Sequence, residues 1–252
     1  MNLNIEEKAK SKLIIALDYD DLKEAQESVE NLGNNVDIYK VGLEIFLNTN
    51  GKIIDYLHEK NKKVFLDLKF HDITNTVKAA CEYAIKRDVF MFNIHCSNGS
   101  KTMRKVAELV KKHNSNSILI GVTVLTNLSE EDIQEMFKSE MNLKELVLNM
   151  ATITKNSGMN GIVCSADEAK FIKEKLGNDF VTVCPGIRPR FTLNKEDDQS
   201  RIMTPYNAIM NNADFLVVGR PVTKSENPVK AVKFIIEEIS KGLNKKSNKL
   251  EK

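Results

Sequence analysis

The sequence predicts an α/β protein, with a single (β/α)8 barrel domain that accounts for residues 1–252. Eight short apolar runs recur along the chain. They are continuous rather than alternating, which is typical of parallel strands covered on both faces. A helical pattern follows each run, and a length of 252 residues matches one barrel of about 250 residues.

The predicted strands lie in LIIAL from residue 13, DIYKVG from 37, KVFLDL from 63, VFMFNI from 89, SILIGVTV from 117, GIVCS from 161, FVTVCPG from 180 and DFLVVGR from 214. An open, doubly wound sheet is the alternative arrangement of alternating strands and helices. That fold typically carries a glycine-rich phosphate turn after its first strand. Here the chain continues as DYDDLKEA, without glycine, which favours the barrel.

The first predicted helix spans 22–32, with Asp20 or Asp21 as its N-cap and Gly33 just past its end. Its apolar residues recur at helical spacing on one face. Further helices are predicted at 43–60, 75–87, 99–113, 143–157, 167–176, 205–211 and 227–240.

Two connections are long. Residues 126–142 contain a predicted short extra helix at 129–137, whereas residues 187–203 are polar and show no periodicity. Long loops without secondary structure in compact domains are commonly binding loops or lids. Residues 241–252 are rich in lysine, and we expect them to form a disordered, solvated tail.

The composition limits the class of protein. With 42% hydrophobic and 29% charged residues, the chain can build a sizeable core. Its 37 lysine and arginine residues nearly balance its 35 aspartate and glutamate residues, which argues against binding to nucleic acid or to a membrane surface. The longest apolar stretch, 118–125, is too short to span a bilayer, and the N-terminus lacks the apolar core of a signal peptide.

The four cysteines, Cys81, Cys96, Cys164 and Cys184, form no CxxC pair and fit no zinc-binding spacing. We expect reduced, buried side chains, which suit a cytoplasmic protein.

Charged residues gather at the carboxyl ends of the first three predicted strands, where barrels of this class carry their chemistry. Because side chains alternate along a strand, Asp67 and Lys69 share a face with Phe65. Lys40 points the same way from the second strand, and Asp18 ends the first. Two carboxylates and two ammonium groups are therefore expected to converge at the mouth of the barrel.

Two other interpretations of this cluster stay open. An inert salt-bridge network could close the barrel, although a hydrophobic plug would be less costly. Asp18, Asp67 and Asp72 could instead bind Mg²⁺. Two lysines that point into the same space argue against a metal ion there, because like charges repel.

A second cluster follows the seventh and eighth predicted strands, where this fold usually binds phosphate. Gly219 allows a ligand to approach the backbone, and Arg220 offers a planar fork to phosphate oxygens. Arg188, Arg190 and Gln199 lie on the long loop that is expected to face them.

His71 and His95 are candidate acid–base groups, but no Ser–His–Asp or Cys–His arrangement accompanies them. A lone histidine beside a strand end is more often a hydrogen-bonded structural group.

The stretch DLKFHDITNT at 67–76 resembles the signature of the orotidine 5'-phosphate decarboxylase family. Thr74 stands where that family usually has proline, and Asn212 stands where glycine is usual; neither departure removes a charged group. The resemblance covers nearly the whole chain in the same order, through ALDYD at 16–20, YKVG at 39–42, NIHCSNG at 93–99, GVTVLTNLSEED at 121–132, PGIRP at 185–189, DDQSR at 197–201 and VVGRP at 217–221.

The resemblance implies a cofactor-free homodimer that converts orotidine 5'-phosphate to UMP and CO2, the last step of de novo pyrimidine synthesis. We expect no metal ion at its site. Lys69 would protonate the pyrimidine, and Asp67 would lie near the substrate carboxylate. The remaining implied roles are an alternating charged chain of Lys40, Asp67, Lys69 and Asp72; a reach of Asp72, Ile73 and Thr76 into the partner's site; ribose binding by Asp18 and Lys40; pyrimidine contact by Thr126; and phosphate binding by Arg188, Gln199, Gly219 and Arg220.

Three alternatives remain at this point. A Mg²⁺-dependent sugar-phosphate decarboxylase or lyase of the same superfamily would share the DxKxxD pattern, but such relatives carry glutamate at the position of Lys40. A non-catalytic barrel that binds a nucleotide phosphate would not need the full charged set. A flavin or pyridoxal barrel would need a separate cofactor anchor, and the sequence offers none that we recognise.

Overall fold

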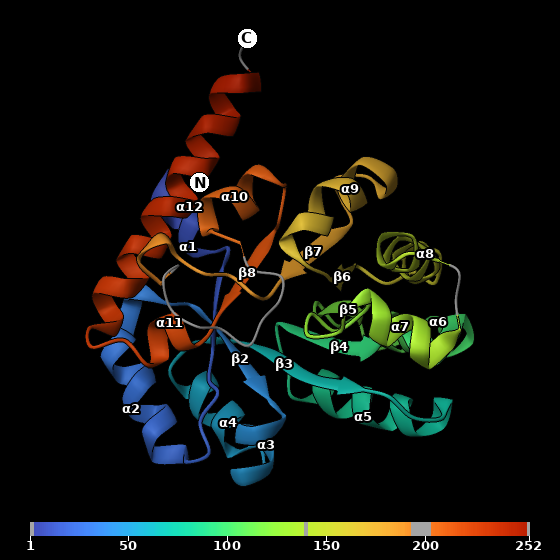
Figure 1. The fold of residues 1–252 in the computed structure, drawn as a ribbon. Helices are drawn as coiled ribbons and strands as arrows, with labels where there is room; N and C mark the ends of the chain where they lie inside the picture. The colour runs from blue at the N-terminus through green and yellow to red at the C-terminus, as the bar shows by residue number, and fades with distance from the viewer. Residues whose placement is uncertain (1–2, 139–140, 193–202, 251–252) are drawn as a thin grey trace.

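The eight apolar runs form eight parallel strands that close into a barrel in the order of the chain, which confirms the predicted fold (Figure 1). The computed structural model describes residues 3–138, 141–192 and 203–250. The strands are β1 (Leu13–Ala16), β2 (Ile38–Gly42), β3 (Lys63–Phe70), β4 (Met91–His95), β5 (Ile118–Val122), β6 (Gly161–Val163), β7 (Val181–Cys184) and β8 (Phe215–Val218).

Helices surround the barrel and lead from the end of one strand to the start of the next (Figure 1). They are α1 (Ile5–Lys10), α2 (Leu22–Leu32), α3 (Leu43–Asn48), α4 (Lys52–Glu59), α5 (Thr74–Lys86), α6 (Gly99–Lys112), α7 (Glu130–Phe137), α8 (Leu143–Asn156), α9 (Ala166–Leu176), α10 (Pro205–Met210), α11 (Arg220–Thr223) and α12 (Pro228–Leu250). Short 3-10 turns are η1 (Gly33–Asn35), η2 (Cys96–Asn98) and η3 (Arg190–Thr192).

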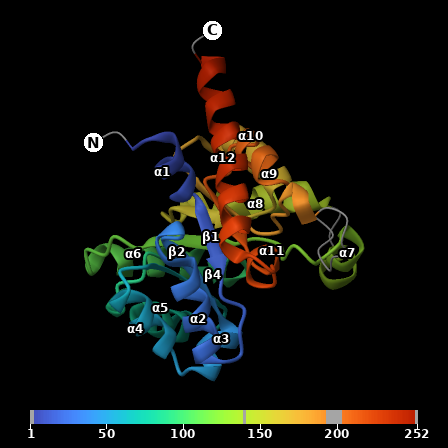
Figure 2. The same ribbon diagram turned by 90° about the vertical axis from the view of Figure 1, so that its left-hand side faces the viewer.

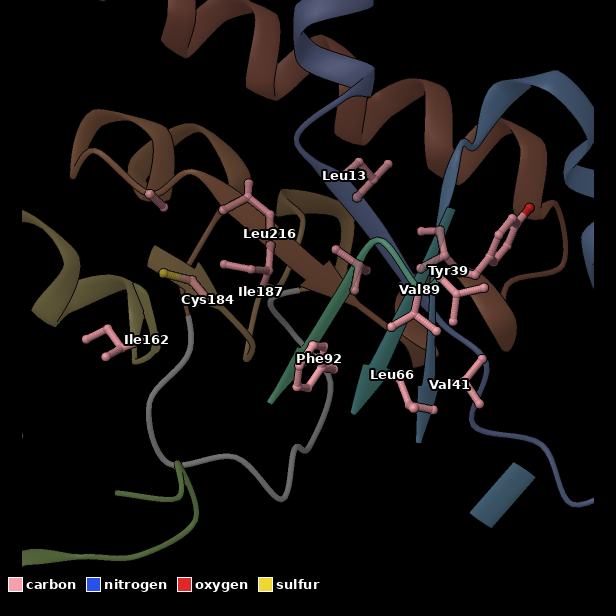
Figure 3. Packing of buried hydrophobic residues seen from close by; sticks show 14 of the residues in the cluster. Leu13, Tyr39, Val41, Leu66, Val89, Phe92, Ile162, Cys184, Ile187 and Leu216 are labelled. Atoms are coloured by element: carbon pink, nitrogen blue, oxygen red, sulfur yellow. The ribbon is translucent and has the colours of Figure 1, made fainter. Parts of the chain in front are cut away.

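The alternation of side chains along the strands divides the core into two layers. Alternate residues such as Ile38, Phe65 and Ile120 fill the barrel interior. Their sequence neighbours, among them Leu66 and Phe92 (Figure 3), belong to a second buried cluster that includes apolar residues of the surrounding helices. Burying each large apolar side chain stabilises the fold by about 1.5–3 kcal/mol. The predicted division, with Phe65 inside and Leu66 under the helices, is confirmed.

Helix α2 begins at its predicted cap. The side chain of Asp21, not Asp20, accepts hydrogen bonds from the N–H groups of Lys23 at 2.8 Å and Glu24 at 3.0 Å. The extra helix predicted at 129–137 is also confirmed, as α7.

The prediction of one helix over 43–60 is wrong, because α3 and α4 are separate. The chain turns between them at Asn50 and Gly51, whose φ angles are 49° and 75°. A side chain at Gly51 would also come within 2.8 Å of the Tyr83 hydroxyl, so this turn requires glycine. Both helices bury apolar residues against the barrel, and this continuity of pattern hides the break in the sequence.

The lysine-rich C-terminus also differs from its prediction, since α12 continues to Leu250 instead of becoming disordered after 240. Figure 2 shows α12 beside α1 and extending beyond it. Gly242 is buried against Ile209 of α10, and the Lys246 ammonium donates to Asn212. Gly242 and Lys246 are four residues apart, so one face of the helix is held even though its lysines suggest a solvated tail.

All four cysteines are free and buried, as predicted. Within the described ranges, no helix combines the length and the apolar character needed to cross a membrane.

Candidate active site

A cavity of about 250 Å³ opens at the carboxyl ends of the strands. Its floor is apolar and includes Phe65, Val183 and Val217 from the barrel interior. The predicted site residues that line it are Asp18, Lys40, Asp67, Lys69, Thr126, Arg188, Gly219 and Arg220. The expected convergence at the mouth of the barrel is therefore present.

Charges of alternating sign run across one side of this cavity. The Lys40 ammonium lies 3.1 Å from Asp18 Oδ1 and 3.5 Å from Asp67 Oδ2. The other oxygen of Asp67, Oδ1, lies 2.8 Å from the Lys69 ammonium. Asp67 is therefore held between two lysines that come from neighbouring strands.

Burial and ion pairing shift the pKa values of Asp67 and Lys40 in opposite directions. Burial raises the pKa of Asp67, but Lys40 and Lys69 outweigh it and hold the pKa below its ordinary value. Burial lowers the pKa of Lys40, but Asp67 and Asp18 outweigh it and raise the pKa above its ordinary value. At neutral pH Asp67 and Lys40 are thus both charged.

This geometry disfavours the Mg²⁺ interpretation of the carboxylates. The Lys40 ammonium occupies the position between Asp18 and Asp67 where a shared cation would bind. Asp72 does not line the cavity. Across the described residues, no three His, Cys, Asp or Glu side chains form a group that could hold a metal.

The wall of the cavity that follows β7 and β8 carries the predicted phosphate ligands Arg188, Gly219 and Arg220. Arg188 is 7% exposed, and its backbone N–H donates to the Met203 carbonyl at 2.8 Å. At Gly219 a side chain would meet Asp18 Oδ2 at 3.2 Å, so glycine keeps this wall open. Gln199 lies outside the described residues.

Arg190 was expected to face this phosphate region, and that expectation is wrong. The guanidinium of Arg190 lies over the Tyr206 ring, 5.9 Å from the centroid. The backbone N–H of Arg190 donates a hydrogen bond to Glu238 Oε1 at 3.0 Å. Arg190 therefore ties the start of the loop to α10 and α12 and does not line the cavity.

Asp72, Ile73 and Thr76 are exposed and lie outside the cavity of their own chain. Asp72 Oδ1 accepts a hydrogen bond from the Ile73 N–H at 2.6 Å, and the Asp72 N–H donates to Asn98 Oδ1 at 3.2 Å. Thr74 begins α5, a position where proline is favoured, and its hydroxyl is 2.8 Å from that of Thr102. The hydrogen bond between Thr74 and Thr102 thus holds the start of α5 at the position where the resemblance leads us to expect proline.

The two histidines lie together beside the site rather than in it. Their ring centroids are 5.2 Å apart, and His71 Nε2 is 3.3 Å from the Ser97 hydroxyl. Burial lowers the pKa of His95, and His71 and Lys69 lower it further. Neither histidine lines the cavity, which agrees with a structural role.

Sequence reasoning missed Asn93, a fully buried side chain on β4 that contacts both Asp67 and Lys69. One signal was present, because Asn93 is a polar residue within the otherwise apolar run VFMFNI.

Comparisons with known proteins agree with the resemblance in the sequence. Residues 11–235 match the model of the orotidine 5'-phosphate decarboxylase / HUMPS family. Proteins named orotidine 5'-phosphate decarboxylase from Saccharophagus degradans and Vibrio cholerae are each 41% identical, over 91% and 92% of this chain and 95% and 98% of theirs. The crystal structure of orotidine 5'-phosphate decarboxylase from Lactobacillus acidophilus is 31% identical, with a TM-score of 0.80 over 91% of this chain and 99% of that one.

Proposed function

Because this chain belongs to the orotidine 5'-phosphate decarboxylase / HUMPS family, we propose that it converts orotidine 5'-phosphate to UMP and CO2. One observation carries the proposal. The chain of charges Asp18, Lys40, Asp67 and Lys69 lines the same cavity as Arg188 and Arg220. A ligand with a phosphate at one end and a reacting carboxylate at the other matches that arrangement.

The chemical difficulty of this reaction is the carbanion that remains on the pyrimidine ring when CO2 leaves, since the ring delocalises it poorly. A fixed ammonium group near that carbon stabilises the developing negative charge and can then protonate it. Lys69 fits this role, because its ammonium group is held by Asp67 at the cavity wall.

Asp67 and Lys40 maintain the charge of the site. Asp67 would lie near the substrate carboxylate, and its Oδ1 holds the Lys69 ammonium at 2.8 Å. Lys40 offsets the burial of Asp67, and with Asp18 it would bind the ribose hydroxyls.

Binding energy far from the reacting carbon can promote the reaction. Arg188 and Arg220, with the backbone at Gly219, would hold the phosphate, and Gln199 would join them. Thr126, which lines the cavity beside Val124 and Leu125, would contact the pyrimidine. The four free, buried cysteines support our expectation that the enzyme works in the cytoplasm.

We also propose that the enzyme is a homodimer in which Asp72, Ile73 and Thr76 complete the partner's site. Ile73 is 73% exposed although it is apolar, and it lies immediately before the first residue of α5. Leu43 and Leu47 of α3 are 53% and 64% exposed, and α3 contacts α5 through Phe46 and Tyr83. Apolar side chains exposed on neighbouring helices suit an interface between subunits.

The direct test is to mix the purified protein with orotidine 5'-phosphate in excess EDTA and to follow the loss of orotate absorbance. We expect rapid loss, with UMP and CO2 as products. No turnover of orotidine 5'-phosphate in EDTA, together with Mg²⁺-dependent turnover of a sugar phosphate, would place the chain among the metal-dependent relatives. No turnover in either assay would favour a phosphate-binding barrel without catalytic activity.

A further inference from the structure

The backbone of β3 is irregular at the residues that carry the charge. β3 pairs with β4 through Phe65 and Met91, then Leu66 and Phe92, and pairing resumes only at Phe70 and Ile94. Three residues of β3, 67–69, therefore lie opposite one residue of β4, which is Asn93. A bulge of this kind redirects side chains and leaves backbone groups without their ladder partners.

Lys69 has a φ angle of 50° within this bulge. This left-handed conformation is unfavourable for a residue with a Cβ atom, because the Cβ atom comes too close to the backbone carbonyl oxygen. Non-glycine residues stay in such conformations where their surroundings hold them there, and they often do so at functional sites.

The side chain of Asn93 is the group in contact. Its Oδ1 accepts a hydrogen bond from the Lys69 backbone N–H at 2.8 Å, and its Nδ2 donates to Asp67 Oδ1 at 2.6 Å. Asp67 Oδ1 is in turn 2.8 Å from the Lys69 ammonium, so the three residues form a closed ring of polar contacts. Asn93 itself is 0% exposed.

The chemistry of the partners fixes the orientation of the amide. A backbone N–H can only donate, so the carbonyl oxygen of Asn93 must face Lys69. An ionised carboxylate can only accept, so the NH2 group must face Asp67. An amide provides one acceptor and one donor at this spacing, and an ionised aspartate or a leucine of similar size does not.

We propose that Asn93 is a positioning residue for the decarboxylation, which holds the backbone of Lys69 and the carboxylate of Asp67 so that the Lys69 ammonium reaches the reacting carbon. This inference rests on the proposed function, and it adds a residue outside the cavity lining to the site. Asn93 does not touch the substrate; it acts through Lys69 and Asp67.

The test is the variant Asn93→Asp, assayed for kcat between about pH 5.5 and pH 8.5, a range in which a carboxyl group beside a second carboxylate can titrate. The introduced carboxylate would face Asp67 and Lys69 from β3, with Lys40 beyond them and His95 on its own strand; its neighbour on β5, Ile120, is uncharged. When ionised, this carboxylate still accepts from the Lys69 N–H but repels Asp67. When protonated, it can donate to Asp67 as the amide does.

We expect kcat about 10²-fold below the wild type at about pH 8. At about pH 5.5 the two carboxylates can share a proton. The kcat of Asn93→Asp, divided by the wild-type kcat at the same pH, should then be at least about tenfold higher than at about pH 8. The Kd for UMP should stay within about threefold, because the phosphate ligands are untouched. A loss of packing alone would not produce this recovery in acid.

The matched control is Asn160→Asp. Asn160 Oδ1 also accepts a hydrogen bond from a strand N–H, that of Leu119, at 2.8 Å. Asn160 immediately precedes β6, so it lies at the end of the barrel opposite the cavity. We expect the wild-type kcat and pH profile from this variant.

A second variant, Asn93→Ala, decides the outcome if Asn93→Asp does not fold. It should lower kcat by about 10²-fold at every pH while UMP binding persists. The proposal is overturned by a wild-type kcat in either Asn93 variant, or by equal losses of kcat and UMP affinity. A failure of the proposed function is read separately, because the wild type and Asn160→Asp would then be inactive as well.

Discussion

At the scale of single residues, Lys69 carries the clearest prediction. In the proposed function, the Lys69 ammonium stabilises and protonates the carbanion, so we expect Lys69→Ala to lower turnover by at least about 10³-fold. Asp67 keeps its contacts with Lys40 and Asn93, so the fold should persist. Steady-state assays with circular dichroism melting check both points. Turnover near the wild-type rate would exclude Lys69 as the proton donor.

Asp67 predicts a pH dependence of stability at the same scale. Its folded-state pKa is below its unfolded value of about 3.9, so its contribution is complete above that pH and is lost as pH falls through the folded pKa. We expect Asp67→Asn to lower the free energy of unfolding by on the order of 3 kcal/mol at about pH 7. The difference should shrink below about pH 4. Urea unfolding at neutral pH and at about pH 3.5 measures it, and a difference that does not change with pH would contradict this account.

At the scale of elements, α2 depends on its N-cap. The Asp21 carboxylate accepts hydrogen bonds from the backbone N–H groups of Lys23 and Glu24, whereas the neighbouring Asp20 does not cap the helix. We expect Asp21→Ala to lower the free energy of unfolding by about 1 kcal/mol. Asp20→Ala is the matched control and should be close to neutral. Equal effects in urea unfolding would mean that loss of charge, rather than the cap, is responsible.

At the scale of the whole molecule, the proposed homodimer predicts complementation between inactive subunits. Mixing Lys69→Ala with Asp72→Ala should give hybrid dimers with one intact site, and about a quarter of the wild-type activity at equal amounts. The control mixture is Lys69→Ala with Asp67→Ala. It should stay inactive, because Asp67 and Lys69 come from one subunit. If the first mixture remains inactive after confirmed subunit exchange, Asp72 does not act across the interface.

The sequence by itself determined the barrel and most of the site. Continuous apolar runs require strands that are covered on both faces, and the period of two along each strand assigned Asp67 and Lys69 to the interior face. Parallel strands in a closed barrel end at one rim, so residues far apart in the chain, such as Asp18 and Arg220, were expected together. Local rules therefore sufficed wherever strand period and strand order decide position.

Only the tertiary structure decided the contacts that cross between elements. The turn at Gly51 depends on Tyr83 of another helix, and the helical C-terminus depends on Ile209 and Asn212. The bulge at Lys69 likewise depends on Asn93 of the neighbouring strand. In each case a partner distant in the chain overrides what a local pattern predicts, because hydrogen bonds and packing are satisfied in space and not along the sequence.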